Sequence, residues 1–430
     1  MGLDGSSVFK LIPARFTLES LDQLFADYPR HDFNVRLWDG TSWGCKEHPR
    51  FTFILKNPSA LWQLMRSPSE LTLGEAFIFD DLDIEGDLEA AFEVGDFLVS
   101  AGERNLSSTP FLAKLLTFPD RHHGKCSGAH PQGEVHSRDR DRQAIQYHYD
   151  LPAEFYSLWL DEAMIYSSAY FENPDESLDS AQFHKMDYIC RKLQLKPGEK
   201  LLDVGCGWGG LLLHAAKHYG VDAVGITLSV RQAEVSRERI RESGLHEHCR
   251  VEITDYRDLE VDRPFDKIVS VGMFEHVGQN HLDEYFARLW SLLKEGGLFL
   301  NSGIAASTTY SRVGPSFIER YVFPDGDLVP ISAALASAES GGFEVRELES
   351  LREHYALTLD HWVRRLQKHE PEAERITDRT TYRIWRLYMA ASAHAFRTGR
   401  NNLYHVLFRR ALASNGSPPT PNALREIENV

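Results

Sequence analysis

Residues 200–210 read KLLDVGCGWGG, the stretch with the strongest structural signal in the chain. Leu201, Leu202 and Val204 form a short apolar strand, and glycines follow at 205, 207, 209 and 210. The next residues, LLLHAAKHY, are typical of a helix. A strand, a glycine turn and a helix make the first unit of a nucleotide-binding α/β domain, in which backbone N–H groups and a helix N-terminus face the ligand.

The glycines also satisfy GxGxxG, so a dinucleotide site has to be weighed. Such a site needs an acidic residue near the end of the second strand, where it holds a ribose hydroxyl. The second predicted strand, VDAVGITLS, has Thr227 there instead. Asp203 completes DVGCGWG, a motif typical of S-adenosylmethionine-dependent methyltransferases, whose glycines let the methionine part of the cofactor lie against the backbone. The motif therefore favours a methyltransferase over a dinucleotide enzyme.

Strands and helices alternate after this unit. Because helices between parallel strands imply a doubly wound sheet, the predicted fold class is α/β, a Rossmann-like sheet of the class I methyltransferase type. Two helical stretches, TTYRIWRLYMAASAHAFR and NLYHVLFRRAL, are predicted near its end. The strands are predicted at 201–204, 221–226, 251–254, 267–273 and 298–302.

At 430 residues the chain is long enough for more than one domain. FNVRLWDGTSWG surrounds Asp39-Gly40, a hairpin signal, and RFTFILKN (50–57) predicts another strand. LTLGEAFIFDDLDIEGDLEAAFEVGDFLVSA is predicted to pass through an extended turn into a helix. The predicted organisation is a smaller N-terminal α+β domain (1–115, a scaffold or lipid-handling unit), a flexible linker (116–143), the methyltransferase domain (144–410) and a disordered tail (411–430).

The formal charge of −16 argues against nucleic acid as a partner. Five cysteines without CxxC spacing favour a reducing, cytoplasmic compartment and no structural zinc, and no apolar run is long enough to span a bilayer. Glu70–Glu103 has eleven acids and no Lys or Arg, whereas Arg379–Arg410 has seven arginines and no acid. The two stretches are interpreted as solvated faces or as docking against each other; alternatively, the arginines and aromatics of the second could contact a membrane.

Eight segments, in order along roughly residues 57–410, resemble the cyclopropane-fatty-acid synthases and the related mycolic acid cyclopropane synthases. That family transfers a methyl group from S-adenosylmethionine to the double bond of an unsaturated acyl chain, then removes a proton to close the ring. The segments are NPSALWQLMRSPSELTLGEAFI, YHYDLPAEFYSLWLDEAMIYSSAYF, LLDVGCGWGG, DYRDL, DKIVSVGMFEHVG, RYVFPDG, HYALTLDHW and AHAFR.

The resemblance implies an enzyme that is cytoplasmic, peripheral at the inner membrane surface, and forms cyclopropane fatty acids from unsaturated phospholipid acyl chains. A first alternative is a C-methyltransferase that gives methylene- or methyl-branched chains. A non-catalytic lipid-binding protein and a methyltransferase of small soluble acceptors are further alternatives. A homodimer is compatible with each of these interpretations.

The resemblance also implies the residues that hold the cofactor. Gly205 and Gly207 lie in the glycine turn, after Asp203. The remaining implied residues fall into three groups: Thr227, Leu228 and Gln232 around the second strand; Asp255, Tyr256 and Arg257 at the adenine edge; and His148, Tyr166 and Ser167 over the methionine end.

Glu275 follows the fourth predicted strand, at the edge of the sheet where ligands bind. A carboxylate there could steady a sulfonium, a developing carbocation, or a hydrogen-bonded anion or water. Flanking aromatics suit either an acyl tunnel or an ordinary core. They are Tyr170, Phe171, Phe274, Phe317, Tyr321 and Phe323.

In the family a bicarbonate ion takes the proton that closes the ring, held by a cysteine, a glutamate, a histidine, a tyrosine and an isoleucine backbone. The matching motifs give Glu275, Tyr355 and Ile304 for three of these roles. Ser168 stands at the cysteine position, and Ser302 at the histidine position, or Asn301 if the alignment slips by one. Neither serine nor asparagine can carry a positive charge. Bicarbonate is therefore a doubtful ligand, and water or Glu275 itself could be the base.

Overall fold

A computed structural model describes residues 14–45, 47–57, 69–102, 128–149, 151–308 and 316–411. The chain divides into two compact units. The N-terminal unit comprises Met1–His130, Ser311–Val322 and Asp378–His394, and the α/β unit comprises Pro131–Tyr310, Phe323–Thr377 and Ala395–Val430.

The N-terminal unit contains a four-stranded sheet in the order β2-β1-β3-β4. The predicted hairpin is present, since β1 and β2 are antiparallel on either side of Asp39-Gly40, and the predicted third strand runs parallel to β1. β4 was predicted only as an extended turn, although it pairs with β3 along its whole length. The strands are β1 Phe33–Arg36, β2 Ser42–Gly44, β3 Phe51–Leu55 and β4 Leu82–Gly86.

Aromatic rings fill the core of this unit. Phe33 stacks on Phe51 with 5.3 Å between ring centroids, and both side chains are almost fully buried. Phe317 of α13 packs on α4 so closely that a Cβ on Gly74 would lie 2.3 Å from its ring. Phe317 is therefore a packing residue of this unit. The helices are α2 Ala14–Leu24, α4 Glu70–Ile78, α5 Leu88–Gly102, α13 Phe317–Tyr321 and residues 379–394 of α17 (Arg379–Arg397).

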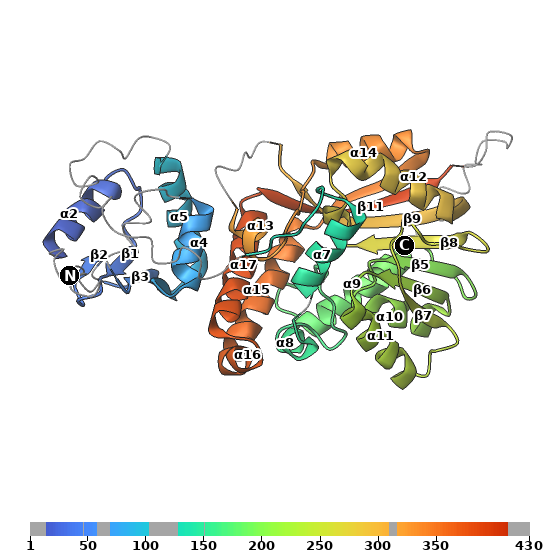
Figure 1. Cartoon of the computed structure of the whole chain (residues 1–430), viewed down its shortest axis with the longest axis horizontal. Coiled ribbons are helices and arrows are strands. Elements are labelled where there is room, and N and C mark those ends of the chain that lie inside the picture. Colours follow the sequence, from blue (N-terminus) through green and yellow to red (C-terminus); the bar gives the residue numbers. More distant parts are fainter. Residues whose placement is uncertain are drawn as a thin grey trace. The chain divides into compact units, whose positions relative to one another are not determined.

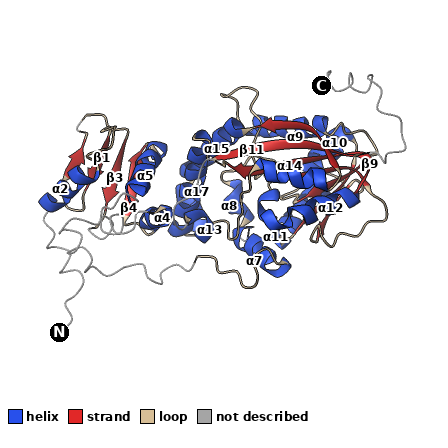
Figure 2. Ribbon diagram, turned by 90° about the horizontal axis from the view of Figure 1, so that it is seen from above, coloured by secondary structure: helices blue, strands red, loops and turns tan. Residues whose placement is uncertain are grey.

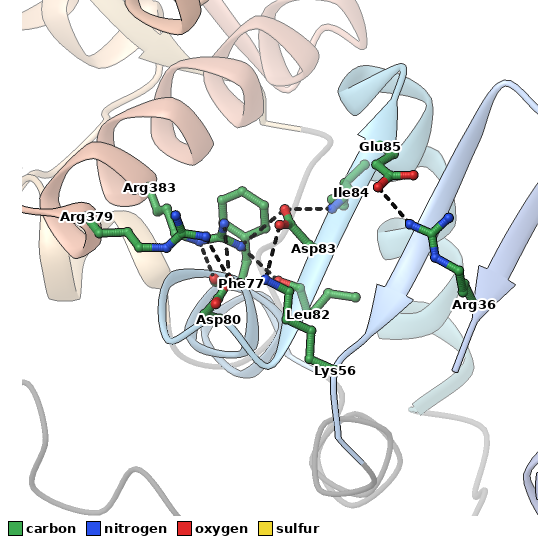
Figure 3. A network of polar contacts seen from close by, with 10 residues as sticks. All are labelled: Arg36, Lys56, Phe77, Asp80, Leu82, Asp83, Ile84, Glu85, Arg379 and Arg383. Carbon is green, nitrogen blue, oxygen red and sulfur yellow. Dashed lines mark hydrogen bonds and ion pairs between the residues drawn. The ribbon is translucent and has the colours of Figure 1, made fainter. Parts of the chain in front are cut away.

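Arg383 of α17 joins the basic stretch to the acidic one (Figure 3). Its side chain is 4% exposed and lies 3.5 Å from Asp80 and 3.4 Å from Asp83. It also donates to the carbonyl oxygens of Phe77 at 2.7 Å and Leu82 at 2.9 Å, with its guanidinium 4.0 Å from the Phe77 ring. These contacts show that the two stretches dock against each other, which is one of the interpretations given for their charge.

The membrane interpretation of Arg379–Arg410 is wrong for most of its aromatics. Phe408 packs in the core of the α/β unit against Phe286 and Phe299, and Phe396 stacks on Tyr355. Trp385 and Tyr388 are also buried. Buried rings are not available to a lipid interface, and the sequence could not distinguish them from interfacial rings because both alternate with arginines.

The α/β unit is built on a seven-stranded sheet in the order β10-β11-β9-β8-β5-β6-β7 (Figure 1). The five strands β9, β8, β5, β6 and β7 are mutually parallel, which confirms the predicted doubly wound sheet. The strands are β5 Lys200–Val204, β6 Asp222–Thr227, β7 Cys249–Ile253, β8 Phe265–Val271, β9 Leu293–Ala306, β10 Phe343–Ser350 and β11 Asn401–Arg410.

Helices cover both faces of this sheet. One apolar cluster joins the strands to α9, α10 and α11, and the other joins them to α12 and α14 on the opposite face (Figure 1). The helices are α7 Arg138–Tyr149, α8 Ala153–Ser157, α9 Leu178–Lys192, α10 Gly210–Tyr219, α11 Val230–Glu242, α12 Leu282–Leu292, α14 Ile331–Ser340, α15 Arg352–Lys368 and α16 Glu370–Ile376, with short turns η3 Phe274–His276 and η4 Gln279–His281.

The prediction of a helix over NLYHVLFRRAL is wrong. This segment is the strand β11 (Figure 2), which pairs with β9 on one side and β10 on the other and runs antiparallel to both. Its apolar residues at 403, 406 and 407 fit helical spacing, but two neighbouring strands supply a complete set of backbone partners. Long-range pairing therefore overrides the local pattern.

The linker prediction is corrected at its C-terminal end, because α7 begins at Arg138. Ion pairs order this polar segment: Arg138 lies 2.7 Å from Asp258, and Arg140 2.6 Å from Asp325. The rest of that range up to 127, the ALWQLMRS part of the first family-like segment and the tail after 411 lie outside the described residues.

We expect Arg383→Met to lower the free energy of unfolding by about 3 kcal/mol, since it leaves two acidic groups without their buried partner. Arg379→Met is the matched control one helical turn away. Arg379 is 51% exposed, so its loss should cost less than about 1 kcal/mol. Urea denaturation of both variants tests this, and equal losses would contradict a special role for Arg383.

Candidate functional site

A cavity of about 140 Å³ opens at the carboxyl ends of β5, β6 and β8. This is the edge of the sheet at which doubly wound folds bind ligands. α7 and α9 contribute to its wall as well. The cavity brings together eleven of the twelve predicted cofactor residues: Tyr166, Ser167, Asp203, Gly205, Gly207, Thr227, Leu228, Gln232, Asp255, Tyr256 and Arg257.

The glycine turn between β5 and α10 forms the floor of this cavity. Gly205 and Gly207 have φ values of +83° and +54°, which side chains rarely adopt. A Cβ on Gly205 would lie 3.0 Å from Met273, whereas a Cβ on Gly207 would meet nothing within 4 Å and would enter open space. The turn therefore keeps room for a ligand against bare backbone.

One end of the cavity is charged. The Asp203 side chain is 3% exposed, and burial raises the pKa of its carboxyl to about 7. Lys185 of α9 lies in the same wall, and its Nζ donates to Ser167 Oγ at 2.9 Å. Burial lowers the pKa of Lys185 to about 8, against the opposing effects of Asp161 and Asp203. This end suits the amino-acid part of the predicted cofactor.

The other end carries the predicted adenine-edge residues. Arg257 holds Asp255 through two hydrogen bonds, of 2.9 Å and 2.6 Å, and donates to Asp141 of α7 at 3.0 Å. Burial alone would raise the pKa of Asp255, but the Arg257 hydrogen bonds lower it below its usual value. Tyr256 adds an aromatic face, so this end offers both a ring and polar groups.

The loop after β6 is fixed by two hydrogen bonds. Thr227 Oγ1 donates to Gln232 Oε1 at 2.9 Å, and Ser229 caps α11 by accepting from the Gln232 N–H. These bonds explain the Gln at position 232, three residues after Ser229. They also hold Thr227, Leu228 and Gln232 in the cavity wall.

His148 is the predicted cofactor residue that does not line the cavity. Its ring is buried and stacks on Phe323, with 3.9 Å between centroids, and on Tyr166 at 5.7 Å. Tyr166 does line the cavity, so His148 supports this tyrosine from behind. Direct contact of His148 with the cofactor stays a prediction, because the ring that lines the cavity here is that of Tyr166, on which His148 stacks.

Glu275 and the backbone of Ile304, which are predicted to hold the same anion, are hydrogen-bonded to each other. Glu275 Oε1 accepts a hydrogen bond from the Ile304 N–H at 2.7 Å, while Oε2 is buried and has no hydrogen-bond partner among the described residues. Burial raises the pKa of Glu275 to about 7 in spite of that hydrogen bond. Residues 273, 276 and 277 line the cavity on both sides of Glu275 in the chain. A carboxyl group with an unused oxygen therefore lies beside the cavity wall.

Tyr355 and Ser168 are buried but do not line the cavity. Tyr355 of α15 reaches it indirectly, because its ring contacts Trp362 at 6.0 Å and Trp362 contacts Tyr166 at 5.3 Å. Ser168 Oγ donates to the Ala169 carbonyl oxygen at 3.0 Å. Its hydroxyl is engaged with backbone in this structure.

Ser302 and Asn301 lie in β9 on opposite faces of the sheet. Asn301 Oδ1 accepts from the Tyr285 hydroxyl at 2.8 Å, within the core under α12. Ser302 pairs across the strands with His405 of β11, a residue that was not singled out from the sequence. His405 is 2% exposed, its Nδ1 has no hydrogen-bond partner in the described part of the chain, and burial lowers its pKa well below the usual value. A neutral imidazole thus stands next to the position where the family has histidine.

The six predicted tunnel aromatics do not form one surface. Phe317 and Tyr321 pack in the N-terminal unit, where Tyr321 donates to Glu75 at 2.8 Å. Phe274 belongs to the core against Gly303, and Phe323 supports His148. Tyr170 and Phe171 stack on His354. For Phe274, Phe317, Tyr321 and Phe323, packing inside the protein is the interpretation that these contacts support.

Lys185 and Asp141 are site residues that sequence reasoning missed. Lys185 lies on the buried face of α9, after Ala181 and Gln182. The signal in the sequence was a charged residue at a position whose helical spacing predicts burial. Asp141 was hidden in a polar segment interpreted as linker.

Comparison with known proteins extends these observations. A family model described as mycolic acid cyclopropane synthetase matches residues 136–406, and one described as a domain of unknown function matches residues 20–95. A probable fatty acid methyltransferase of Pseudomonas putida is 44% identical over 377 residues, 87% of this chain and 90% of that protein. The cyclopropane-fatty-acyl-phospholipid synthase of Escherichia coli K12 is 41% identical over 266 residues, 62% of this chain and 67% of that protein.

A solved structure shows the same fold. Mycolic acid cyclopropane synthase CmaA1, complexed with SAH and CTAB, is 35% identical, with a TM-score of 0.59 covering 62% of this chain and 98% of that chain. The sheet and helices of the α/β unit are therefore those of a class I methyltransferase, as predicted.

We expect Gly207→Val to weaken S-adenosylmethionine binding at least about tenfold, because its side chain enters the open part of the cavity. Gly244→Val is the matched control: Gly244 also has positive φ, +71°, and open space around it, but lies on an exposed turn. Isothermal titration calorimetry compares them. A cofactor affinity lost equally in both variants would point to backbone strain rather than to the cavity.

Proposed function

Since this chain belongs to the mycolic acid cyclopropane synthetase family, we propose that it methylates the double bond of unsaturated acyl chains in phospholipids. It is an S-adenosylmethionine-dependent methyltransferase acting on lipid double bonds, as the family is. Membership in a family of enzymes sets aside the non-catalytic lipid-binding alternative. The phospholipid acceptor is supported by the E. coli relative, whose name specifies a fatty-acyl-phospholipid.

The residues of the cavity fit this cofactor. Bare backbone at Gly207, one cation and one carboxyl group at one end and an aromatic ring with polar neighbours at the other match an amino acid joined to an adenine nucleoside. Bound S-adenosylmethionine supplies an electrophilic methyl group. The protein holds it through Asp203, the glycine turn and the Asp255–Arg257 edge.

One observation carries the proposal: the buried Glu275 carboxyl with its unused Oε2. Methyl addition to a carbon–carbon double bond produces positive charge on carbon, which a nearby carboxylate stabilises strongly in a site of low dielectric. Glu275 can also accept the proton that must leave the transferred methyl group. The Ile304 N–H fixes the carboxyl so that one oxygen remains available.

The product is either a cyclopropane or a methylene- or methyl-branched chain. Ser302 cannot carry charge, and the adjacent His405 is kept neutral by burial, so neither strand supplies a cation for a bound bicarbonate. This favours a proton acceptor other than bicarbonate. The P. putida relative, named a fatty acid methyltransferase without mention of a ring, is consistent with the branched alternative.

Access to the acyl chain requires contact with a membrane surface, which we propose to be peripheral. In the described residues no helix is both long and apolar enough to cross a bilayer.

Expression in a host without such enzymes tests the function. We expect new fatty acids heavier than the host's unsaturated ones by one CH₂, and Glu275→Gln should reduce them by about a hundredfold or more through loss of the carboxylate. Cyclopropane and methylene products have equal mass, so proton NMR distinguishes them. Folded, cofactor-binding protein that leaves every acyl chain unchanged would refute the proposed acceptor.

We also expect added bicarbonate to change the rate of methyl transfer by less than about twofold, because the anion would lack a charge-assisted hydrogen bond. Purified enzyme is assayed on unsaturated phospholipid vesicles in bicarbonate-depleted and supplemented buffer. Strong activation with a pure cyclopropane product would show that the substituted pocket still holds the anion.

A further inference from the structure

Lys185 is a buried cation in the wall of the cofactor cavity. The residue is 3% exposed and projects from the apolar face of α9, whose other buried members are largely hydrophobic. Lysine is rarely buried without a counter-charge, because removing an ammonium from water costs several kcal/mol. Its presence in this wall therefore needs a reason.

The protein itself does not neutralise Lys185 by direct contact. Within the described residues it forms no ion pair, and its Nζ donates to the neutral hydroxyl of Ser167 at 2.9 Å. Asp161 and Asp203 act on it through space, and Asp161 already accepts from the N–H groups of Ala163 and Ile165, each at 2.9 Å. These hydrogen bonds favour the Asp161 carboxylate, but burial still raises its pKa above the usual value, so Asp161 is an incomplete counter-charge for Lys185.

Asp203 lines the same cavity and is buried to the same extent. One buried cation and one buried carboxylate in a single cavity are complementary to a zwitterion, since each ligand charge would meet its opposite where water is excluded. The α-amino acid part of S-adenosylmethionine is such a zwitterion. Burial depresses the pKa of Lys185 to about 8, which still leaves the amine mostly charged at pH 7.

We infer that Lys185, together with the Ser167 hydroxyl, binds the α-carboxylate of the cofactor while Asp203 accepts from its α-ammonium. Lys185 is then the residue by which the enzyme selects a cofactor that carries a carboxylate. The inference depends on the identity of the cofactor and is independent of the lipid acceptor, so failure of one leaves the other intact.

The test compares S-adenosylmethionine and S-adenosylhomocysteine with decarboxylated S-adenosylmethionine, which lacks only the carboxylate. Calorimetry on Lys185→Met should show about tenfold or greater loss of affinity for the first two ligands, as expected for a charged hydrogen bond, and less than about threefold for the third. Lys192→Met is the matched control. Lys192 is buried on the same helix but pairs with Glu347 at 2.7 Å and Glu349 at 2.5 Å outside the cavity, so all three affinities should persist.

Equal losses for the carboxylated and decarboxylated ligands would overturn the inference, because Lys185 would then act only by shaping the cavity. Unchanged affinities would overturn it as well. Lys185→Gln, which keeps much of the length, serves if the methionine variant does not fold. The wild-type protein gives a further measurement: it must bind S-adenosylmethionine at least about tenfold more tightly than the decarboxylated ligand, and equal binding refutes the role of Lys185 without any variant.

Discussion

The structure depends on a backbone turn that leaves the central strand and makes room for a ligand. The N–H groups of Gly205 and Cys206 both donate to the Ile226 carbonyl oxygen at 3.0 Å, which ties the end of β5 to β6. α10 then starts at Gly210, five residues after Gly205. Positive φ at three glycines allows this reversal, so the cavity lies where β5, β6 and β8 end together.

Burial of ionisable groups around this turn prepares the site for charge. Asp203, Lys185 and Glu275 all have pKa values moved toward neutrality, and in each case desolvation is the largest cause. A buried ionisable group destabilises the fold when no ligand is bound. The same low dielectric strengthens its interaction with a charged ligand. The first two line the cavity, whereas Glu275 lies in the chain between residues that line it.

The same sheet contains the feature that separates this chain from the family pattern. β11 brings His405 beside Ser302, so an imidazole is present one strand away from the expected place, buried and neutral. Methyl transfer requires only the cofactor cavity and a carboxylate. Proton removal requires a base, and the exchanged residues alter the place where the family pattern puts it.

The sequence by itself determined the α/β class, the cofactor turn and most of the cavity, because DVGCGWG and the residues after each strand act through short-range geometry. The motifs also identified Glu275 and Ile304 as neighbours of one anion, and the structure joins them by a direct hydrogen bond. Only the tertiary structure decided that NLYHVLFRRAL is a strand, because its backbone partners lie in β9 and β10, far away in the sequence. It likewise decided that Arg383 is a buried packing residue and that Lys185 lines the cavity. A charged side chain has the same local pattern whether it faces water, an acidic partner or a ligand, and only the packing of distant segments distinguishes these surroundings.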